Sequence, residues 1–218
     1  MPRAARTAEP SNRDLLAQQL TPQQVHLLRN TYHLISERGV HAVALEDIAE
    51  LAGVSKGILL YYFKTKEKLV LATMKWALSA TADRIHSAMA AAHSPEAKVL
   101  AMIDAIWVGA ETNRGFYLTY VDLAAQAARN ESFTELSATF HLIVDSLYAE
   151  AVAEGAGIGA FGVESVEEAA TVVRAIIDGL FIQWMQGRTW KKRHAAYREI
   201  CKRAVLAYLT RPAGTPAA

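Results

Sequence analysis

The chain has 218 residues, enough for one or two domains, and its 52% hydrophobic and 21% charged residues are ordinary for a globular protein with a sizeable core. Glycine and proline are scarce, at 12 and 6 residues, which favours helices. The formal net charge is only +1, but residues 1–75 carry 10 basic and 7 acidic groups, so the basic excess lies near the N-terminus. A single cysteine excludes an intramolecular disulfide and is consistent with a reducing cytosol, and the lack of any run of 18 apolar residues argues against a membrane span.

The first 20 residues contain three arginines and two prolines but no apolar segment. We expect residues 1–20 to form a disordered arm rather than a signal peptide. Apolar side chains then recur at helical steps from Val25 to Ile35, after Thr21 and before Gly39. This pattern predicts the first helix.

The most informative segment runs from Leu45 to Phe63 and reads LEDIAELAGVSKGILLYYF. Ala49 would allow two short helices to cross closely, and Gly53 can adopt the positive φ of the turn between them. Ser55 is a natural N-cap, so a second helix should begin there and present its first turn to whatever it faces. The spacing predicts a helix-turn-helix, although any αα-hairpin with a glycine turn would show the same spacing.

The residues that follow the second helix favour DNA binding over a plain hairpin. Tyrosines and lysines are interleaved there, and a new helix should begin at Thr65. Phenol hydroxyls, ammonium groups and a helix N-terminus are suited to holding DNA phosphates, whereas a solvated charged face would leave the aromatic residues unexplained. We expect Lys56 to reach a base edge or a phosphate, and Lys66 to hold the backbone. The candidate DNA-binding residues are Ser55, Lys56, Gly57, Ile58, Tyr61, Tyr62, Lys64 and Lys66.

From about Val25 to Met74 the chain resembles the DNA-binding domain of the TetR (tetracycline-repressor) family of bacterial regulators. The family pattern is DIAxxAGVSxGxLYxxFxxKExL. The matching residues are Asp47, Ile48, Ala49, Ala52, Gly53, Val54, Ser55, Gly57, Leu59, Tyr61, Phe63, Lys66, Glu67 and Leu69. Ala44 replaces the usual Ser or Thr cap, and Ile58 and Leu60 replace a polar residue and a tyrosine that commonly touch DNA in the family.

The resemblance implies an all-α, cytoplasmic homodimer that represses transcription from a palindromic double-stranded DNA operator and responds to a small-molecule effector, although nothing in the residues excludes an activator. We expect a three-helix helix-turn-helix domain over residues 21–64, a helical ligand-binding and dimerisation domain over 65–210, and a tail over 211–218. A helix predicted over 65–92 should be the only element that contacts both parts and should move as a lever.

Further apolar stripes predict the helices of the body. Two of them, over 131–154 and 164–186, are wide, and in proteins that resemble this one such a pair forms a four-helix dimer interface. Residues 175–180 also resemble the penultimate helix of the betaine-pathway branch of the family. A last helix is expected over 192–209.

Seven aromatic or polar-tipped residues of the body helices could converge on an apolar chamber with a few hydrogen-bonding groups. Such a chamber suits a small, largely apolar effector, although the same aromatic residues are also ordinary core residues. The candidate effector-binding residues are Trp107, Tyr117, Tyr120, Phe140, His141, Phe181 and Trp184.

Two local patterns resemble other structures. The segment GIGAFG, Gly157 to Gly162, has the form G-x-G-x-x-G, but a helical stripe precedes it and no acidic residue stands about twenty residues after Gly162, so we expect a flexible connector that begins near Gly155. Asp178 and Gly179 form a common hairpin pair, but the apolar residues around them follow one helical face.

Enzyme signatures are missing from the sequence. It contains no G-x-S-x-G, no HExxH and no Cys-x-x-Cys, and its seven histidines lack ligand spacing. We therefore expect no catalytic residues, no metal site and no cofactor. The alternatives are a helical enzyme or carrier protein without DNA specificity, and a purely structural adaptor. The basic run over 188–194 could bind an acidic partner or form a solvated loop.

Overall fold

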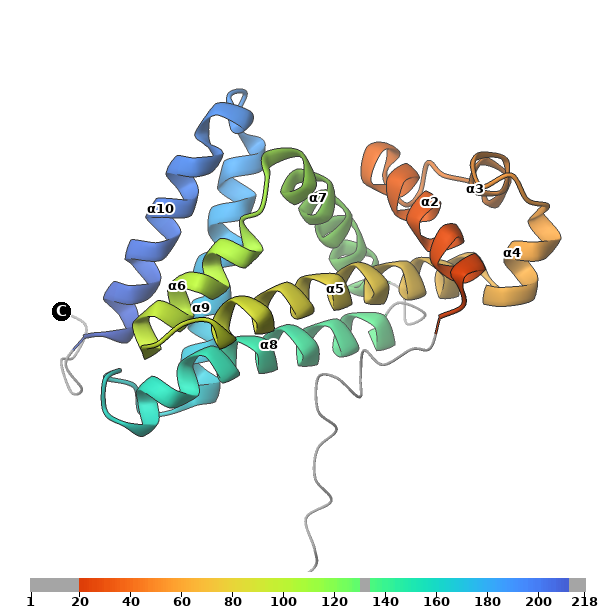
Figure 1. The fold of residues 1–218 in the computed structure, drawn as a ribbon. Helices are drawn as coiled ribbons and strands as arrows, with labels where there is room; N and C mark the ends of the chain where they lie inside the picture. Colours follow the sequence, from red (N-terminus) through yellow and green to blue (C-terminus); the bar gives the residue numbers. More distant parts are fainter. Residues whose placement is uncertain (1–19, 130–133, 212–218) are drawn as a thin grey trace, which may run out of the picture.

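The computed structural model describes residues 20–129 and 134–211. Within these ranges the chain forms nine α-helices and no strand, so the all-α prediction is confirmed (Figure 1). In chain order the helices are α2 (Pro22–Arg38), α3 (Leu45–Leu51), α4 (Lys56–Phe63), α5 (Lys66–Ala90), α6 (Pro95–Ile106), α7 (Ala110–Ala127), α8 (Thr134–Gly157), α9 (Val166–Gln186) and α10 (Trp190–Leu209). The arm and the tail predicted for residues 1–20 and 211–218 lie almost entirely outside the described residues.

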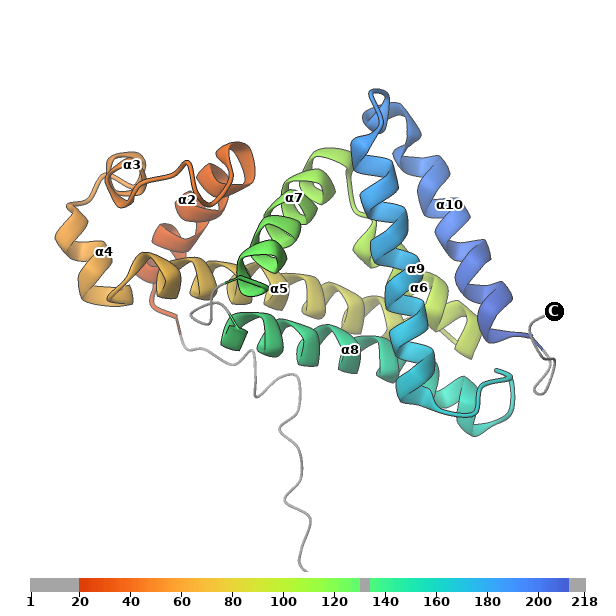
Figure 2. The ribbon, with the colours of Figure 1, turned by 180° about the vertical axis from the view of Figure 1, so that it is seen from behind.

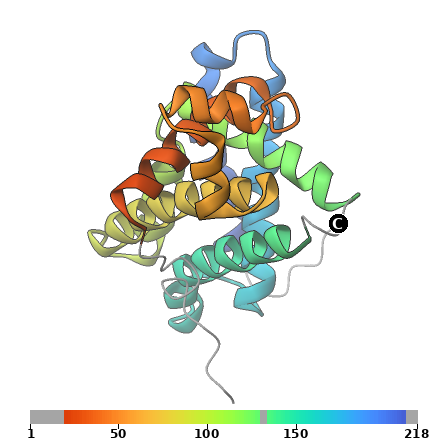
Figure 3. The same cartoon turned by 90° about the vertical axis from the view of Figure 1, so that its right-hand side faces the viewer.

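Helices α2, α3 and α4 gather at one end of the long helix α5, and α6 to α10 gather around the rest of it (Figure 1). We call the first group the head and the second group the body. When the molecule is turned so that its right-hand side faces the viewer, the head lies in front of the body helices (Figure 3). Each part has its own apolar cluster, with Leu27, Ile48 and Leu59 in the head and Met102, Val173 and Val205 in the body.

Local sequence explains the three helices of the head. The Thr21 hydroxyl accepts the Gln24 amide proton at 3.2 Å, and the Gln24 side chain accepts from the Thr21 amide at 2.9 Å, which completes a capping box. Ala44 caps α3 with no side-chain hydrogen bond, as expected, but the Asp47 carboxylate accepts the Ala44 amide proton at 2.7 Å. Gly53 has the positive φ, 64°, that the turn before α4 was predicted to need.

The glycine-rich segment is an ordered turn, and the boundary predicted at Gly155 is wrong because α8 continues to Gly157. The amides of Ala160 and Phe161 both donate to the Gly155 carbonyl oxygen, at 2.8 and 3.0 Å. The Phe161 ring is buried and lies so close to the helix that a β-carbon at Gly155 would stand 2.3 Å from it. This glycine is therefore required by close packing, and the motif resembles a nucleotide loop only in its letters.

The expectation that the helix after the head is the only element in contact with both parts is also wrong. Helix α7 packs against α2 as well as against the body helices α8, α9 and α10. Figure 2 shows α7 between α2 and α9. The Asp122 carboxylate of α7 accepts the backbone amide proton of Val40, in the turn after α2, at 2.9 Å. Two elements, α5 and α7, thus connect the head to the body.

Candidate DNA-reading helix and effector cavity

Helix α4 has one buried and one exposed side. Leu59 and Phe63 face inward and are buried, as their four-residue spacing requires. On the outside lie Gly57, Ile58 and Tyr61; the Ile58 and Tyr61 side chains are 38% and 71% exposed. The predicted recognition helix therefore presents its first turn and Tyr61 to the surroundings.

The charged groups near α4 are held by short-range contacts. The Lys56 ammonium lies 2.6 Å from the Glu46 carboxylate of α3, and this hydrogen bond lowers the pKa of Glu46. Lys64, the C-cap residue directly after α4, has a φ of 65°, and its ammonium donates to the Tyr61 carbonyl oxygen at 2.9 Å. Ser55 stands at the N-cap position without a capping hydrogen bond from its side chain.

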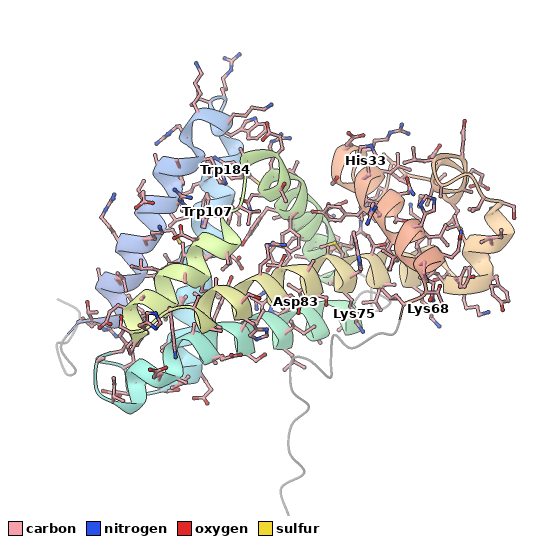
Figure 4. The ribbon with its side chains drawn as sticks, in the orientation of Figure 1. His33, Lys68, Lys75, Asp83, Trp107 and Trp184 are labelled. Atoms are coloured by element: carbon pink, nitrogen blue, oxygen red, sulfur yellow. The ribbon has the colours of Figure 1, made fainter. Side chains whose placement is uncertain are left out.

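The two remaining candidates, Tyr62 and Lys66, lie near the end of α4 and at the start of α5. Tyr62 is half-buried, its ring 5.1 Å from that of Tyr61. Lys66 begins α5, where the Thr65 hydroxyl accepts the Lys68 amide proton at 3.2 Å, so a second helix N-terminus lies next to the end of α4. Lys68 and Lys75 mark this part of α5 in Figure 4. The eight candidate residues lie within residues 55–66, from the N-cap of α4 to the first residue of α5.

A cavity of about 200 Å³ lies between α5 and the body helices and reaches Tyr32 of the head. Its wall is mostly apolar and includes side chains of α2, α5, α7, α8 and α9. Six aromatic residues line it: Tyr32, Trp76, Phe116, Tyr117, Tyr120 and Tyr148. Its polar lining includes Asp178, Asn113 and Arg84. Since Tyr32 belongs to α2, the head itself forms part of the cavity wall.

Of the predicted effector residues whose side chains the structure describes, Tyr117 and Tyr120 alone line this cavity. Trp107, Phe181 and Trp184 are buried in the core, and Figure 4 labels the two tryptophans. The Phe181 ring stacks on both Trp107 and Tyr117, with centroids 3.7 and 3.9 Å apart, so it packs behind a ring of the cavity wall. His141 is exposed on α8 and does not line the cavity, and the Phe140 side chain lies outside the described residues.

The sequence patterns did not indicate that Asp178 lines the cavity, because they identify this residue only as part of the Asp178-Gly179 pair that is common in β-hairpins. Its carboxylate accepts hydrogen bonds from the Tyr117 hydroxyl at 3.0 Å and from the Tyr120 hydroxyl at 3.5 Å. Arg174, one turn earlier in α9, donates to it at 3.3 Å. A carboxylate within the apolar stripe of a predicted helix was the available signal, because acidic residues are rarely buried without a partner.

The ionisation of this cluster is set by burial and by its charges. Burial raises the pKa of Asp178, although Arg174 and the two tyrosine hydroxyls act in the opposite direction. Burial, reinforced by the nearby Asp178 charge, also raises the pKa of Tyr117 and Tyr148, so both phenols keep their protons. Arg174 is shared, because it also donates to the Asp145 carboxylate at 2.7 Å. The cavity therefore has aromatic walls and one partly buried acid.

Among the residues described, no group of three or more His, Cys, Asp or Glu side chains is arranged to hold a metal ion. Nor is any described helix long and apolar enough to cross a membrane.

A helix-turn-helix head joined to a helical body that encloses a ligand-sized cavity defines a ligand-responsive DNA-binding protein as the structural class. The family comparisons agree. The model for bacterial regulatory proteins of the tetR family matches residues 27–73, and the model for the C-terminal part of BetI-type transcriptional repressors matches residues 95–210. The chain belongs to the TetR family of transcriptional regulators and has a BetI-type C-terminal domain.

Relatives and solved structures support the same assignment. The HTH-type transcriptional regulator BetI of Burkholderia thailandensis is 30% identical over 169 residues, which is 76% of this chain and 81% of the relative. BetI of Rhizobium meliloti is 28% identical over 69% of this chain and 71% of the relative.

Two solved structures show the same fold. A TetR transcription regulator from Haloarcula marismortui has a TM-score of 0.72 at 21% identity, over 87% of this chain and 97% of that chain. A transcriptional regulator from Saccharomonospora viridis in complex with choline has a TM-score of 0.73 at 20% identity, over 86% and 97%.

Proposed function

We propose that this regulator binds a palindromic operator as a homodimer and that a compact organic cation in the cavity changes its operator affinity. The observation that carries the proposal is that Tyr32 of the head and Asp178 of the body line the same cavity. A ligand held there contacts both parts. It can alter their relative position only if it binds one arrangement more tightly than the other.

The chemistry of the wall supports a cation with apolar substituents rather than the purely apolar effector expected from the sequence. Quaternary ammonium groups bind inside cages of aromatic rings, which attract them through cation–π interactions. Asp178 adds a negative charge whose burial a bound cation would offset. The choline complex of the Saccharomonospora viridis regulator supports this ligand class. Arg84 also lines the cavity, but it is exposed and donates to its own helix, at Ala80 and Thr81.

The signal to the head would pass through two connections. Helix α5 bears Trp76 and enters the head directly, as the lever predicted from the sequence. Helix α7 bears Tyr117 and Tyr120 in the cavity wall, and two residues later it bears Asp122, which bonds the turn after α2. A shift of α7 on ligand binding would therefore reach the head without passing through α5.

The proposed dimer interface is the outer face of α8 and α9. Leu142, Val172 and Ile182 are large apolar side chains exposed on these helices, and a β-carbon at Gly179 would meet nothing within 4 Å. Such exposed apolar surface is typical of interfaces. We expect sedimentation at micromolar concentration to show a dimer that Gly179→Asp dissociates. A monomeric native protein would rule out the interface. Ile177 is fully buried, so a charge placed there would unfold the subunit and test nothing.

The test of the whole proposal begins with selection of bound duplexes from a randomised DNA pool. Affinity for the selected duplex and for a scrambled duplex is then measured with and without choline, and binding of choline is followed by emission of Trp76, the tryptophan that lines the cavity. We expect a strong preference for the selected duplex and a change in its affinity at saturating choline. Trp76→Phe should remove the fluorescence response. Equal affinity for both duplexes would refute the proposal.

A further inference from the structure

The outer face of α4 carries very little hydrogen-bonding capacity. Its eight residues read KGILLYYF and contain no Arg, Asn, Gln, Asp or Glu. Paired hydrogen bonds from Arg or Lys to guanine, or from Asn or Gln to adenine, are the usual way in which a recognition helix identifies a base. Lys56 is the only such side chain of α4, so an apolar contact is the other source of base selectivity that this helix offers.

Two outward side chains of α4, Lys56 and Tyr61, could form hydrogen bonds with a base, but each already contacts a neighbouring side chain. The Lys56 ammonium lies 2.6 Å from Glu46, so α3 holds it at the edge of the helix. The Tyr61 ring lies against the Tyr62 ring, and the Lys64 ammonium lies 5.5 Å from the centre of the Tyr61 ring. A phenol hydroxyl flanked by a lysine suits a phosphate.

Ile58 is the remaining outward side chain of the first turns. It is 38% exposed, three residues from Tyr61 and therefore on the same side of the helix. Gly57 beside it adds no side chain that would hold the helix away from the bases. In the major groove, the apolar group that distinguishes one base from the others is the C5 methyl group of thymine.

We infer that Ile58 reads the operator by packing on the C5 methyl group of a thymine in each half-site. The inference rests on the proposed operator binding and adds the base class that α4 selects. Lys56, Tyr61 and the residues after α4 then position the helix, whereas the apolar contact of Ile58 supplies base selectivity. A two-fold dimer would place two such thymines symmetrically, one under each recognition helix.

The experiment replaces single thymines of the selected duplex by uracil, which removes the methyl group and leaves every hydrogen-bonding atom in place. We expect one thymine per half-site at which replacement weakens binding of the full-length protein about fourfold, equivalent to about 0.8 kcal/mol for one buried methyl group. Replacement at thymines outside the half-sites should change affinity little.

Variants then assign that thymine to Ile58. In Ile58→Ala the uracil and thymine duplexes should bind equally at this position, because the partner of the methyl group has been removed. Ile158→Ala removes another exposed isoleucine, in the turn after α8, and should keep the fourfold difference. A full difference in Ile58→Ala, or no uracil-sensitive thymine in the native complex, overturns the inference. If the native protein shows no preference for the selected duplex over the scrambled duplex, the proposed function itself is overturned.

Discussion

Asp178→Asn should separate the charge of the cavity from its shape. Asp178 accepts from Tyr117, Arg174 and Tyr120 at 3.0, 3.3 and 3.5 Å, so the carboxylate is fixed at the wall, and asparagine preserves its size. Hydrogen bonds to charged groups contribute about 1.5–3 kcal/mol, and we take the same range for the contact between the carboxylate and a quaternary ammonium, which attracts it by charge alone. Choline affinity should therefore fall about 10- to 150-fold. Arg174 keeps its 2.7 Å contact with Asp145, so the variant should still fold.

Calorimetry can measure this effect against a neutral ligand of the same shape. The carbon isostere of choline, in which a quaternary carbon replaces the nitrogen, should bind the native protein and Asp178→Asn with similar affinity. Asp145→Asn is the matched control, because it removes the other carboxylate of Arg174 and does not line the cavity. If Asp178→Asn weakens choline and the isostere equally, the carboxylate has a structural role and the cation proposal fails.

The same carboxylate predicts a pH dependence. Burial raises the pKa of Asp178, so the group takes up its proton at a higher pH than an exposed aspartate, whose pKa is about 3.9. The protonated acid no longer attracts a cation. Choline affinity should therefore fall as the pH falls, beginning above the usual aspartate range, while affinity for the neutral isostere stays level. Choline binding that is independent of pH down to that range would contradict the assignment.

Two further variants test the turn after α8 and the second connection to the head. Gly155→Ala should lower the melting temperature by a few degrees, because overpacking against Phe161 costs about 1–3 kcal/mol and outweighs a gain of about 1 kcal/mol in helix propensity. Gly157→Ala should not lower it, because a β-carbon at Gly157 would meet open space. Equal effects of the two substitutions would refute the packing argument. Asp122→Ala leaves the buried Val40 amide without its acceptor. This variant should reduce the effect of choline on operator affinity more than it changes the affinity for choline itself. Asp122→Asn, which keeps an acceptor oxygen, should retain most of the coupling. An unchanged effect in Asp122→Ala would exclude this route.

The head could be predicted from the sequence because its determinants are local. The positive φ of Gly53, the inward spacing of Leu59 and Phe63 and the start of α5 after Thr65 each depend on a few neighbouring residues. The missing cap at Ala44 was also expected, but its replacement by Asp47 depends on a side-chain conformation that spacing does not specify.

The cavity could be predicted only in part because its wall is assembled from distant segments. Tyr32 and Asp178 line it together although 146 residues separate them. Aromatic content identified Tyr117, but it could not distinguish a lining ring from a core ring, and Trp107 and Phe181 proved to be core. That distinction depends on the rotation of each helix about its axis, which follows from tertiary packing.

The charged pair of α9 provides the strongest reason to regard the cavity as a binding site rather than a packing defect. Arg174 and Asp178 are one turn apart on a helix whose other inward residues are apolar, and a buried ion pair is often no more stabilising than apolar side chains of similar volume. Removing a single partner of an ion pair leaves an uncompensated charge, although Asp145 still pairs with Arg174 when Asp178 is replaced, so the Arg174–Asp178 pair constrains the sequence without an evident gain in stability. A role in ligand recognition accounts for it, because Arg174 and the tyrosine hydroxyls hold the Asp178 carboxylate at the wall where a cation would meet it.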